Sequence, residues 1–195
     1  MVVRANIRHR VSLKEPSYAD YEHFFDTRFS DEVVYWADDG PQILSKDEYA
    51  RTRLMMLRFG QVIERVIVLD GESIGTVSAR PCERIETQCI LSIVIAIPEL
   101  WGLGYGSVAL KLFLVELWEL GFKVAVLETY ANNRRAQRCF TKLGFVKRRA
   151  YFSGHTGRFV LEMVCALARH RAIGEVVRPG DPRWKLPHGK GKEGT

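Results

Sequence analysis

A glycine-rich turn between an apolar strand and a long apolar helix constrains the fold of this chain more than any other feature. Residues 87–97 are almost continuously apolar, which predicts a strand in the middle of a sheet with both faces covered. The turn Trp101-Gly102-Leu103-Gly104-Tyr105-Gly106 follows. Residues 107–120 then predict a largely buried helix that Gly121 ends, and residues 123–129 predict another strand. The centre of the chain is therefore a strand, helix, strand unit.

The segments on either side predict more strands and helices. Asp70-Gly71 readily adopts the positive φ angles of a hairpin turn, and Ser45-Lys46-Asp47-Glu48 has the spacing of a helix capping box. Residue patterns predict strands at residues 7–13, 62–69, 73–80, 146–152 and 158–166. Helix signals predict a short helix from Ser17 and helices over residues 45–59 and 134–143.

Length and charge favour one domain with a basic tail. The chain has 195 residues, of which 47% are hydrophobic, and this suits a single domain over residues 1–168. The formal charge is +6, but much of the excess lies in residues 169–195, where Trp184 is the residue we expect to dock. We therefore expect no nucleic-acid partner for the domain, while RNA binding by the tail stays open as a third possibility.

Localisation signals and cysteine spacing favour a cytoplasmic protein without a metal. The first residues lack the pattern of a signal peptide, and the longest apolar run, residues 89–98, is far shorter than the roughly 20 residues that cross a bilayer. We expect no membrane association. The four cysteines show no C-x-x-C spacing and no neighbouring histidine partner, so we expect reduced thiols and no zinc site.

The glycine-rich turn has the character of an anion site. Backbone amides around Leu103, Tyr105, Gly106 and Ser107 would lie at the positive end of the following helix, where a diphosphate is a natural ligand. Gly104 and Gly106 lack the Cβ atoms that would hinder close approach. A tight connection without a ligand is the alternative. The spacing fits neither the mononucleotide loop nor the dinucleotide fingerprint.

A second motif narrows the choice. Asn132-Asn133-Arg134-Arg135-Ala136 begins shortly after the strand at 123–129, and Cys139-Phe140 and Leu143-Gly144-Phe145 follow. Together with the W-G-x-G-Y-G turn and its lead-in Pro98-Glu99-Leu100-Trp101, this pattern resembles the GNAT acetyltransferase superfamily. It resembles in particular the branch that includes the ribosomal-protein-alanine acetyltransferases. The matched stretch runs from about residue 90 to residue 146.

The resemblance implies an α/β fold with a coenzyme in a split sheet. It implies a mixed sheet of about seven strands, splayed between strands 4 and 5 and flanked by about four helices, with acetyl-CoA in the gap. The diphosphate would meet residues 103–107, and Phe140 would line the coenzyme site. Asn133 would reach the coenzyme arm, or would cap the last helix, or both. The pantetheine would pair with backbone groups along Val94, Ile95 and Ala96.

Acyl transfer to an amine needs a base, a donor for the thioester oxygen and an acid for the leaving thiolate. A backbone amide near Val94 or Ile95 could be the donor. Glu128, at the end of the strand at 123–129, is the leading candidate for the base, although a solvated strand end is the alternative reading. Glu83 and Glu86 are weaker candidates, and His155 is expected at a hairpin tip on the surface. Many relatives place a tyrosine where this chain has Phe140, so Tyr130 is a candidate acid, or simply a packing residue.

The expected function is transfer of an acetyl group from acetyl-CoA to a primary amine, on a small molecule or a protein N-terminus, by a possible homodimer. A non-catalytic acyl-CoA-binding module is the alternative. The first two helices and their connection would form the acceptor wall, where Val33, Tyr35 and Trp36 could line the pocket or belong to the core. Negative charge there could attract a cationic amine, from Asp26, Asp31, Glu32, Asp38, Asp39, Asp47 and Glu48.

Overall fold

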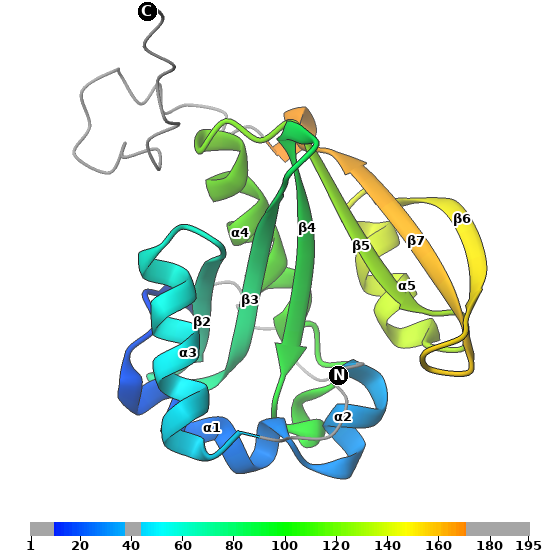
Figure 1. Ribbon diagram of the computed structural model, residues 1–195. Coiled ribbons are helices and arrows are strands. Elements are labelled where there is room, and N and C mark those ends of the chain that lie inside the picture. Colours follow the sequence, from blue (N-terminus) through cyan, green and yellow to red (C-terminus); the bar gives the residue numbers. More distant parts are fainter. Residues whose placement is uncertain (1–9, 38–43, 171–195) are drawn as a thin grey trace, which may run out of the picture.

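One seven-stranded mixed sheet organises the protein, in the strand order β1-β2-β3-β4-β5-β7-β6. The computed structural model describes residues 10–37 and 44–170 (Figure 1). In this part of the chain β4 and β5 form the one parallel pair, and all other neighbours are antiparallel. The strands are β1 (Val11–Lys14), β2 (Ile63–Leu69), β3 (Glu72–Cys82), β4 (Ile85–Ile95), β5 (Val124–Tyr130), β6 (Val146–Ser153) and β7 (Arg158–Ala166). The predicted seven-stranded mixed sheet is confirmed.

Helices cover the two faces of the sheet unequally. Helices α1 (Tyr18–Arg28) and α3 (Lys46–Arg58) pack on one face, and α4 (Tyr105–Glu119) and α5 (Arg134–Lys142) lie on the other (Figure 1). A fifth helix, α2 (Asp31–Ala37), was not among the predicted ones. Short 3-10 turns follow β4 and β7, namely η2 (Pro98–Leu100) and η3 (Leu167–His170).

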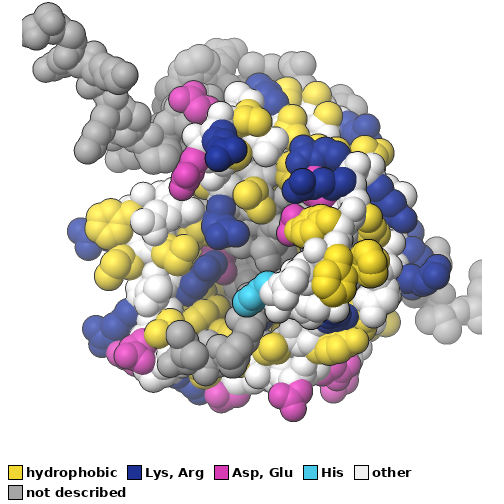
Figure 2. Space-filling model, turned by 45° about the vertical axis from the view of Figure 1, so that its right-hand side comes forward, with side chains coloured by type: hydrophobic (Ala, Val, Ile, Leu, Met, Phe, Trp, Pro, Cys, Tyr) yellow, Lys and Arg dark blue, Asp and Glu magenta, His cyan; other side chains and the backbone are white. Residues whose placement is uncertain are grey.

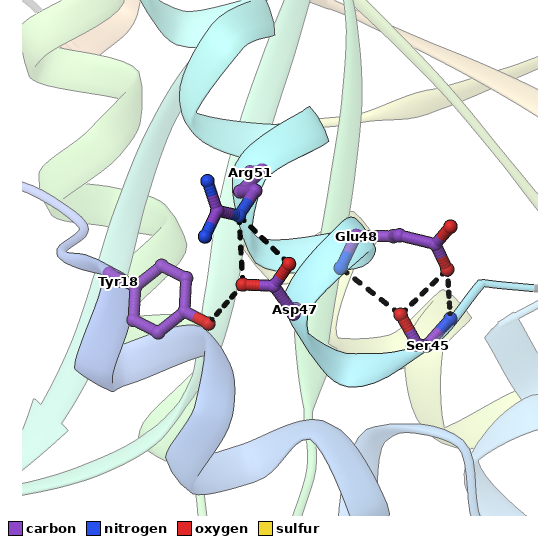
Figure 3. A network of polar contacts seen from close by, with 5 residues as sticks. All are labelled: Tyr18, Ser45, Asp47, Glu48 and Arg51. Carbon is purple, nitrogen blue, oxygen red and sulfur yellow. Dashed lines mark hydrogen bonds and ion pairs between the residues drawn. The ribbon is translucent and has the colours of Figure 1, made fainter.

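The helix cap and the hairpin turn predicted from local sequence are both present in the structure. At the start of α3, the Ser45 hydroxyl and the Glu48 carboxylate cap each other's backbone amides (Figure 3). Asp70 and Gly71, which join β2 to β3, both have positive φ angles, of 52° and 93°. The predicted first strand began at Ile7, which lies outside the described residues.

The core lies mainly between α4 and the sheet. Ala109, Leu110, Phe113, Leu114 and Leu117 of α4 are fully buried, which explains why this helix is almost entirely apolar. The prediction that both faces of β4 are covered is wrong for one face, where Ile90 is 41% exposed and Ser92 is exposed as well. Helices α1 and α3 pack against Ala96, just past the end of β4, and leave the face at Ile90 open.

The sheet divides between β4 and β5. Their ladder pairs Gln88 with Val124 and ends where Leu91 pairs with Leu127. Beyond that pair β4 continues to Ile95 and β5 to Tyr130, and the two strands diverge (Figure 1). The predicted splay between strands 4 and 5 is confirmed.

The described part of the chain ends in a docked turn. Leu167 in η3 is fully buried, and the Arg169 guanidinium donates to the Gly144 carbonyl oxygen at 3.2 Å. Trp184 lies outside the described residues. All four cysteines are free. Of the helices in residues 10–37 and 44–170, none combines the length and the apolar character needed to cross a membrane.

Candidate functional site

Two adjoining cavities occupy the region where β4 and β5 diverge. Their volumes are about 230 Å³ and about 100 Å³, and they share seven lining residues. Figure 2 shows a hollow near the middle of this side of the molecule, with lysine and arginine side chains beside it. The shared residues are Trp36, Ala37, Ile93, Val94, Asn133, Ala136 and Phe140.

The glycine-rich turn borders the larger cavity. Gly102 and Gly104 have φ angles of 79° and 96°, a conformation that side chains with a Cβ rarely adopt. Gly104 is the N-cap of α4, so the turn delivers the chain directly into the helix. A Cβ on Gly106 would lie 3.8 Å from side-chain atoms of Ile93 and Ile95. The wall of the cavity at this point is therefore the diverging part of β4.

Three of the four amides predicted to hold an anion are available for a ligand. Within the described residues, the N–H groups of Leu103, Tyr105 and Gly106 have no hydrogen-bond acceptor. The predicted Ser107 amide is not free, because it donates to the Gly104 carbonyl oxygen at 3.0 Å. The Ser107 side chain still lines the larger cavity, and its hydroxyl lies 3.1 Å from the thiol of Cys139.

A row of cations on α5 faces the same cavity. Arg135, Arg138 and Lys142 line it, and none of them forms an ion pair within the part of the chain that the structure describes. The Arg135 guanidinium lies 3.9 Å from the ring centre of Trp101, and burial lowers the pKa of this arginine. Sequence reasoning missed these residues, although their spacing of three and four positions marks one face of a helix.

Strand alternation decides which backbone groups of β4 face the gap. The Ala96 amide donates to the Ile74 carbonyl oxygen at 2.9 Å, so it is turned toward β3 and is unavailable, contrary to prediction. Alternate residues of an antiparallel strand point their N–H and C=O groups the same way, so Val94 also faces β3. Ile95 and Ile93 face the gap, and the Ile95 carbonyl accepts from the Trp101 indole at 2.9 Å.

Asn133 and Phe140 lie at the junction of the two cavities. The Asn133 side chain accepts from the Ala136 amide at 3.1 Å and so caps α5 while lining both cavities. The cap is observed, and the contact with a coenzyme stays a prediction. Phe140 is buried against Phe145, with ring centres 6.0 Å apart. Its ring gives the junction an apolar surface without a hydroxyl.

Of the predicted acid and base residues, Glu128 alone lines a cavity. It borders the smaller one, and its Oε1 accepts a hydrogen bond from the Tyr151 hydroxyl at 2.8 Å. Tyr130 is 5% exposed and lines neither cavity. The Arg158 guanidinium packs on its ring, 3.4 Å from the ring centre. The packing reading of Tyr130 therefore fits the structure. Glu83, Glu86 and the exposed His155 also lie outside both linings.

Helix α2 closes the open end of the gap. Val33, Trp36 and Ala37 line the larger cavity, whereas Tyr35 is exposed and lines neither cavity. Arg158 of β7 anchors α2, because its Nη1 donates to the Tyr35 carbonyl oxygen at 2.7 Å. Its guanidinium also lies 5.6 Å from the Trp36 ring centre.

The expected acidic wall is absent from these linings. Among the described residues, none of the predicted carboxylates borders either cavity. Asp47 accepts from Tyr18 and Arg51, Glu48 caps α3, and Asp26 pairs with Lys46 at 3.0 Å. Asp31 and Glu32 are exposed in the first turn of α2. Asp38 and Asp39 lie outside the described residues.

Comparisons with known proteins agree with this architecture. A family model described as an acetyltransferase (GNAT) domain matches residues 10–146. Spermidine N-acetyltransferase from Vibrio cholerae, solved with CoA and spermine, superposes with a TM-score of 0.73 at 17% identity, over 83% of this chain and 98% of that one. Aminoglycoside acetyltransferase AAC(6')-Ib, solved with coenzyme A, superposes with a TM-score of 0.68 at 18% identity, over 80% of this chain and 94% of that one. Comparison of the sequence with curated proteins found no match.

Proposed function

Because this chain belongs to the GNAT acetyltransferase family, we propose that it moves the acetyl group of acetyl-CoA directly to a primary amine. The observation that carries the proposal is the meeting of three free amides, at Leu103, Tyr105 and Gly106, with a gap between diverging strands. The amides suit a diphosphate, and the gap suits an extended chain attached to it. We further propose a cytoplasmic location, which suits an enzyme with four free cysteines.

The residues around the larger cavity fit coenzyme A. The three free amides would hold the diphosphate at the positive end of the α4 dipole, and Arg135, Arg138 and Lys142 would neutralise its charge. Ile93 and Ile95 would offer backbone groups to the pantetheine, while Phe140 and Asn133 would border it. When bound, the coenzyme supplies the activated thioester.

The amine needs to lose a proton before it attacks. An alkylamine has a pKa of about 10.4, so near neutral pH a base has to accept its proton. Glu128 is the proposed base, since it is the carboxylate that borders the smaller cavity among the described residues. The Ile95 amide would donate to the thioester oxygen, a contribution of about 2.7–4 kcal/mol for a donor of this kind. Because a thiol has a pKa of about 8.5, protonating the leaving thiolate is less demanding than deprotonating the amine.

The proposed acceptor is a cationic primary amine, on a small molecule or a protein N-terminus. Glu128 is exposed and forms no ion pair within the described residues, so its charge is available to an ammonium group. Trp36, which borders both cavities, offers an aromatic surface beside it. The two relatives compared above act on polyamines and aminoglycosides, which are amines of this kind.

Release of free thiol from acetyl-CoA on addition of amines tests the proposal. The panel would contain polyamines, aminoglycosides, amino-acid amines and peptides with free N-termini. Turnover with one class is expected. Gly106→Trp would place an indole against Ile93 and Ile95 in the gap, and we expect it to abolish coenzyme binding. Leu112→Trp, on the exposed side of α4, is the matched control and keeps binding. Unchanged coenzyme affinity in Gly106→Trp would refute the assigned site.

A non-catalytic acyl-CoA-binding module is the second candidate. Phe140 cannot donate a proton, and Tyr130 packs away from both cavities, so neither residue serves as an acid. Tight coenzyme binding without thiol release across the whole amine panel would favour this candidate over the enzyme.

A further inference from the structure

Two glutamates lie side by side on the face of the sheet that carries the proposed base. Glu128 on β5 is the register partner of Glu162 on β7, so their side chains project from the same face. Like charges in this arrangement repel each other. The two carboxylates therefore need different surroundings if both are to stay ionised.

Glu162 is fully compensated by two arginines. The residue is 4% exposed, and its carboxylate forms ion pairs with Arg148 and, at 3.0 Å, with Arg149. A register irregularity between Lys147 and Arg149 is what lets β6 present both guanidinium groups to one carboxylate. The hydrogen bond from Arg148 lowers the pKa of Glu162, and that from Arg149 adds to it. Glu162 is thus a fixed anion and not a proton acceptor.

Glu128 has a different partner. Its Oε1 accepts from the Tyr151 hydroxyl at 2.8 Å, and within the described residues no arginine or lysine pairs with it. The hydrogen bond to Glu128 raises the pKa of Tyr151 to about 12, so the phenol stays protonated and donates throughout the neutral range. The Arg149 guanidinium lies 5.2 Å from the Tyr151 ring centre, which links the phenol to the Glu162 cluster. Glu128 is held without being neutralised by a cation.

We propose that Tyr151 is a positioning residue, which fixes Glu128 by occupying Oε1 and leaves Oε2 to accept the acceptor's proton. The inference rests on the proposed function. Tyr151 lines neither cavity, so it acts through Glu128 and not on the reacting atoms. The strand β6 thereby contributes to catalysis from outside both cavity linings.

The test compares Tyr151→Phe, Glu128→Gln and the double variant, each as the full chain with acetyl-CoA and the best amine of the panel. We expect Tyr151→Phe to lower kcat about 10-fold with the KM for acetyl-CoA unchanged, since it removes one hydrogen bond to a charged group. Glu128→Gln should lower kcat about 100-fold or more. The double variant should match Glu128→Gln, because Tyr151 has nothing left to position.

Tyr18→Phe is the matched control. Tyr18 donates to Asp47 at 2.6 Å, another phenol–carboxylate contact, on the α1–α3 surface outside both cavity linings (Figure 3). The control should keep the wild-type kcat.

Four results would overturn the inference. The first is a Tyr151→Phe enzyme as fast as the wild type. The second is a double variant about 10-fold slower than Glu128→Gln, which would show an effect that does not pass through Glu128. The third is a Tyr151→Phe protein that no longer binds coenzyme, which would make the residue structural. The fourth is absence of turnover in the wild type, which defeats the proposed function as well, whereas the first three leave it standing.

Discussion

The cations of α5 differ from most surface arginines and lysines of this protein in what they face. Arg138 and Lys142 border the larger cavity without an ion pair within the described residues, next to a turn with three free amides. Arg148 and Arg149, by contrast, both form ion pairs with Glu162. An uncompensated cation beside an anion site is available for a phosphate, so these residues should contribute to coenzyme affinity.

Neutralising one of these cations should therefore weaken the binding of acetyl-CoA and leave the rate of acetyl transfer unchanged. For Arg138→Gln we expect the KM for acetyl-CoA to rise about 2- to 5-fold, as about 0.5–1 kcal/mol for a partly exposed charge implies, with kcat unchanged. The rise should shrink at high salt. Arg134→Gln, exposed on the same helix but outside the lining, is the control. Equal KM values for Arg138→Gln and the wild type at low salt would contradict the prediction.

Residues whose role depends on local chain order could be predicted from sequence, and residues brought together by the sheet could not. Gly104 and Asn133 sit at helix starts, and their conformation and cap follow from neighbours in the chain. Glu128 was predicted as a candidate because it lies near the end of a strand. Tyr151 was missed because its contact with Glu128 requires β7 to lie between β5 and β6 and the β6 strand to be irregular. No local pattern encodes either feature.

At the scale of elements, one buried carboxylate ties β1, α1 and β3 together. Asp20 in the first turn of α1 accepts from Ser17 and from Ser73 of β3 at 2.8 Å, and it pairs with Lys14 of β1 at 2.7 Å. Burial alone would raise the pKa of Asp20. The hydrogen bonds from Lys14, Ser17 and Ser73 outweigh that effect and lower it from 3.8 to about 2.

This network should make stability depend on pH in acid. Because the folded pKa of Asp20 lies below the unfolded one, its stabilisation is present above about pH 4 and is lost as pH falls toward 2. The difference in unfolding free energy between wild type and Asp20→Asn should be about 2 kcal/mol at pH 5 and approach zero near pH 2. Urea unfolding at several pH values measures it. Ser73→Ala should show a smaller difference of the same sign, and a gap independent of pH would contradict the assignment.

Elements with strong terminal signals were predicted, and the short helix that shapes the site was not. The capping box at Ser45 located α3 to within a residue or two. Helix α2 has seven residues, and its position depends on tertiary contacts, chiefly the bond from Arg158 to the Tyr35 carbonyl and the burial of Val33. The sequence placed negative charge on the acceptor wall and named Val33, Tyr35 and Trp36 as pocket or core residues. In the structure α2 lines the larger cavity with Val33, Trp36 and Ala37.

For the whole molecule, the split of the sheet was expected from family resemblance and not from periodicity. Hydrophobic patterning identified β4 and β5 as strands, but it carries no information on where a parallel ladder ends. The ladder stops at Leu91 and Leu127, and Phe140, Asn133 and Trp36 line the two cavities in the space that opens beyond it. The two halves of the sheet are joined along a short ladder.

A ligand that lies in this gap contacts both halves and should stabilise the fold as a unit. With coenzyme A at 100 times its Kd, linkage gives about 2.7 kcal/mol, which for a chain of this size raises Tm by roughly 5–10 °C. Thermal unfolding with and without coenzyme measures the shift. Gly106→Trp should lose it, because the indole would fill the gap beside Ile93 and Ile95, and Leu112→Trp should keep it. A shift of equal size in Gly106→Trp would mean that the coenzyme binds elsewhere and that the split sheet is not its site.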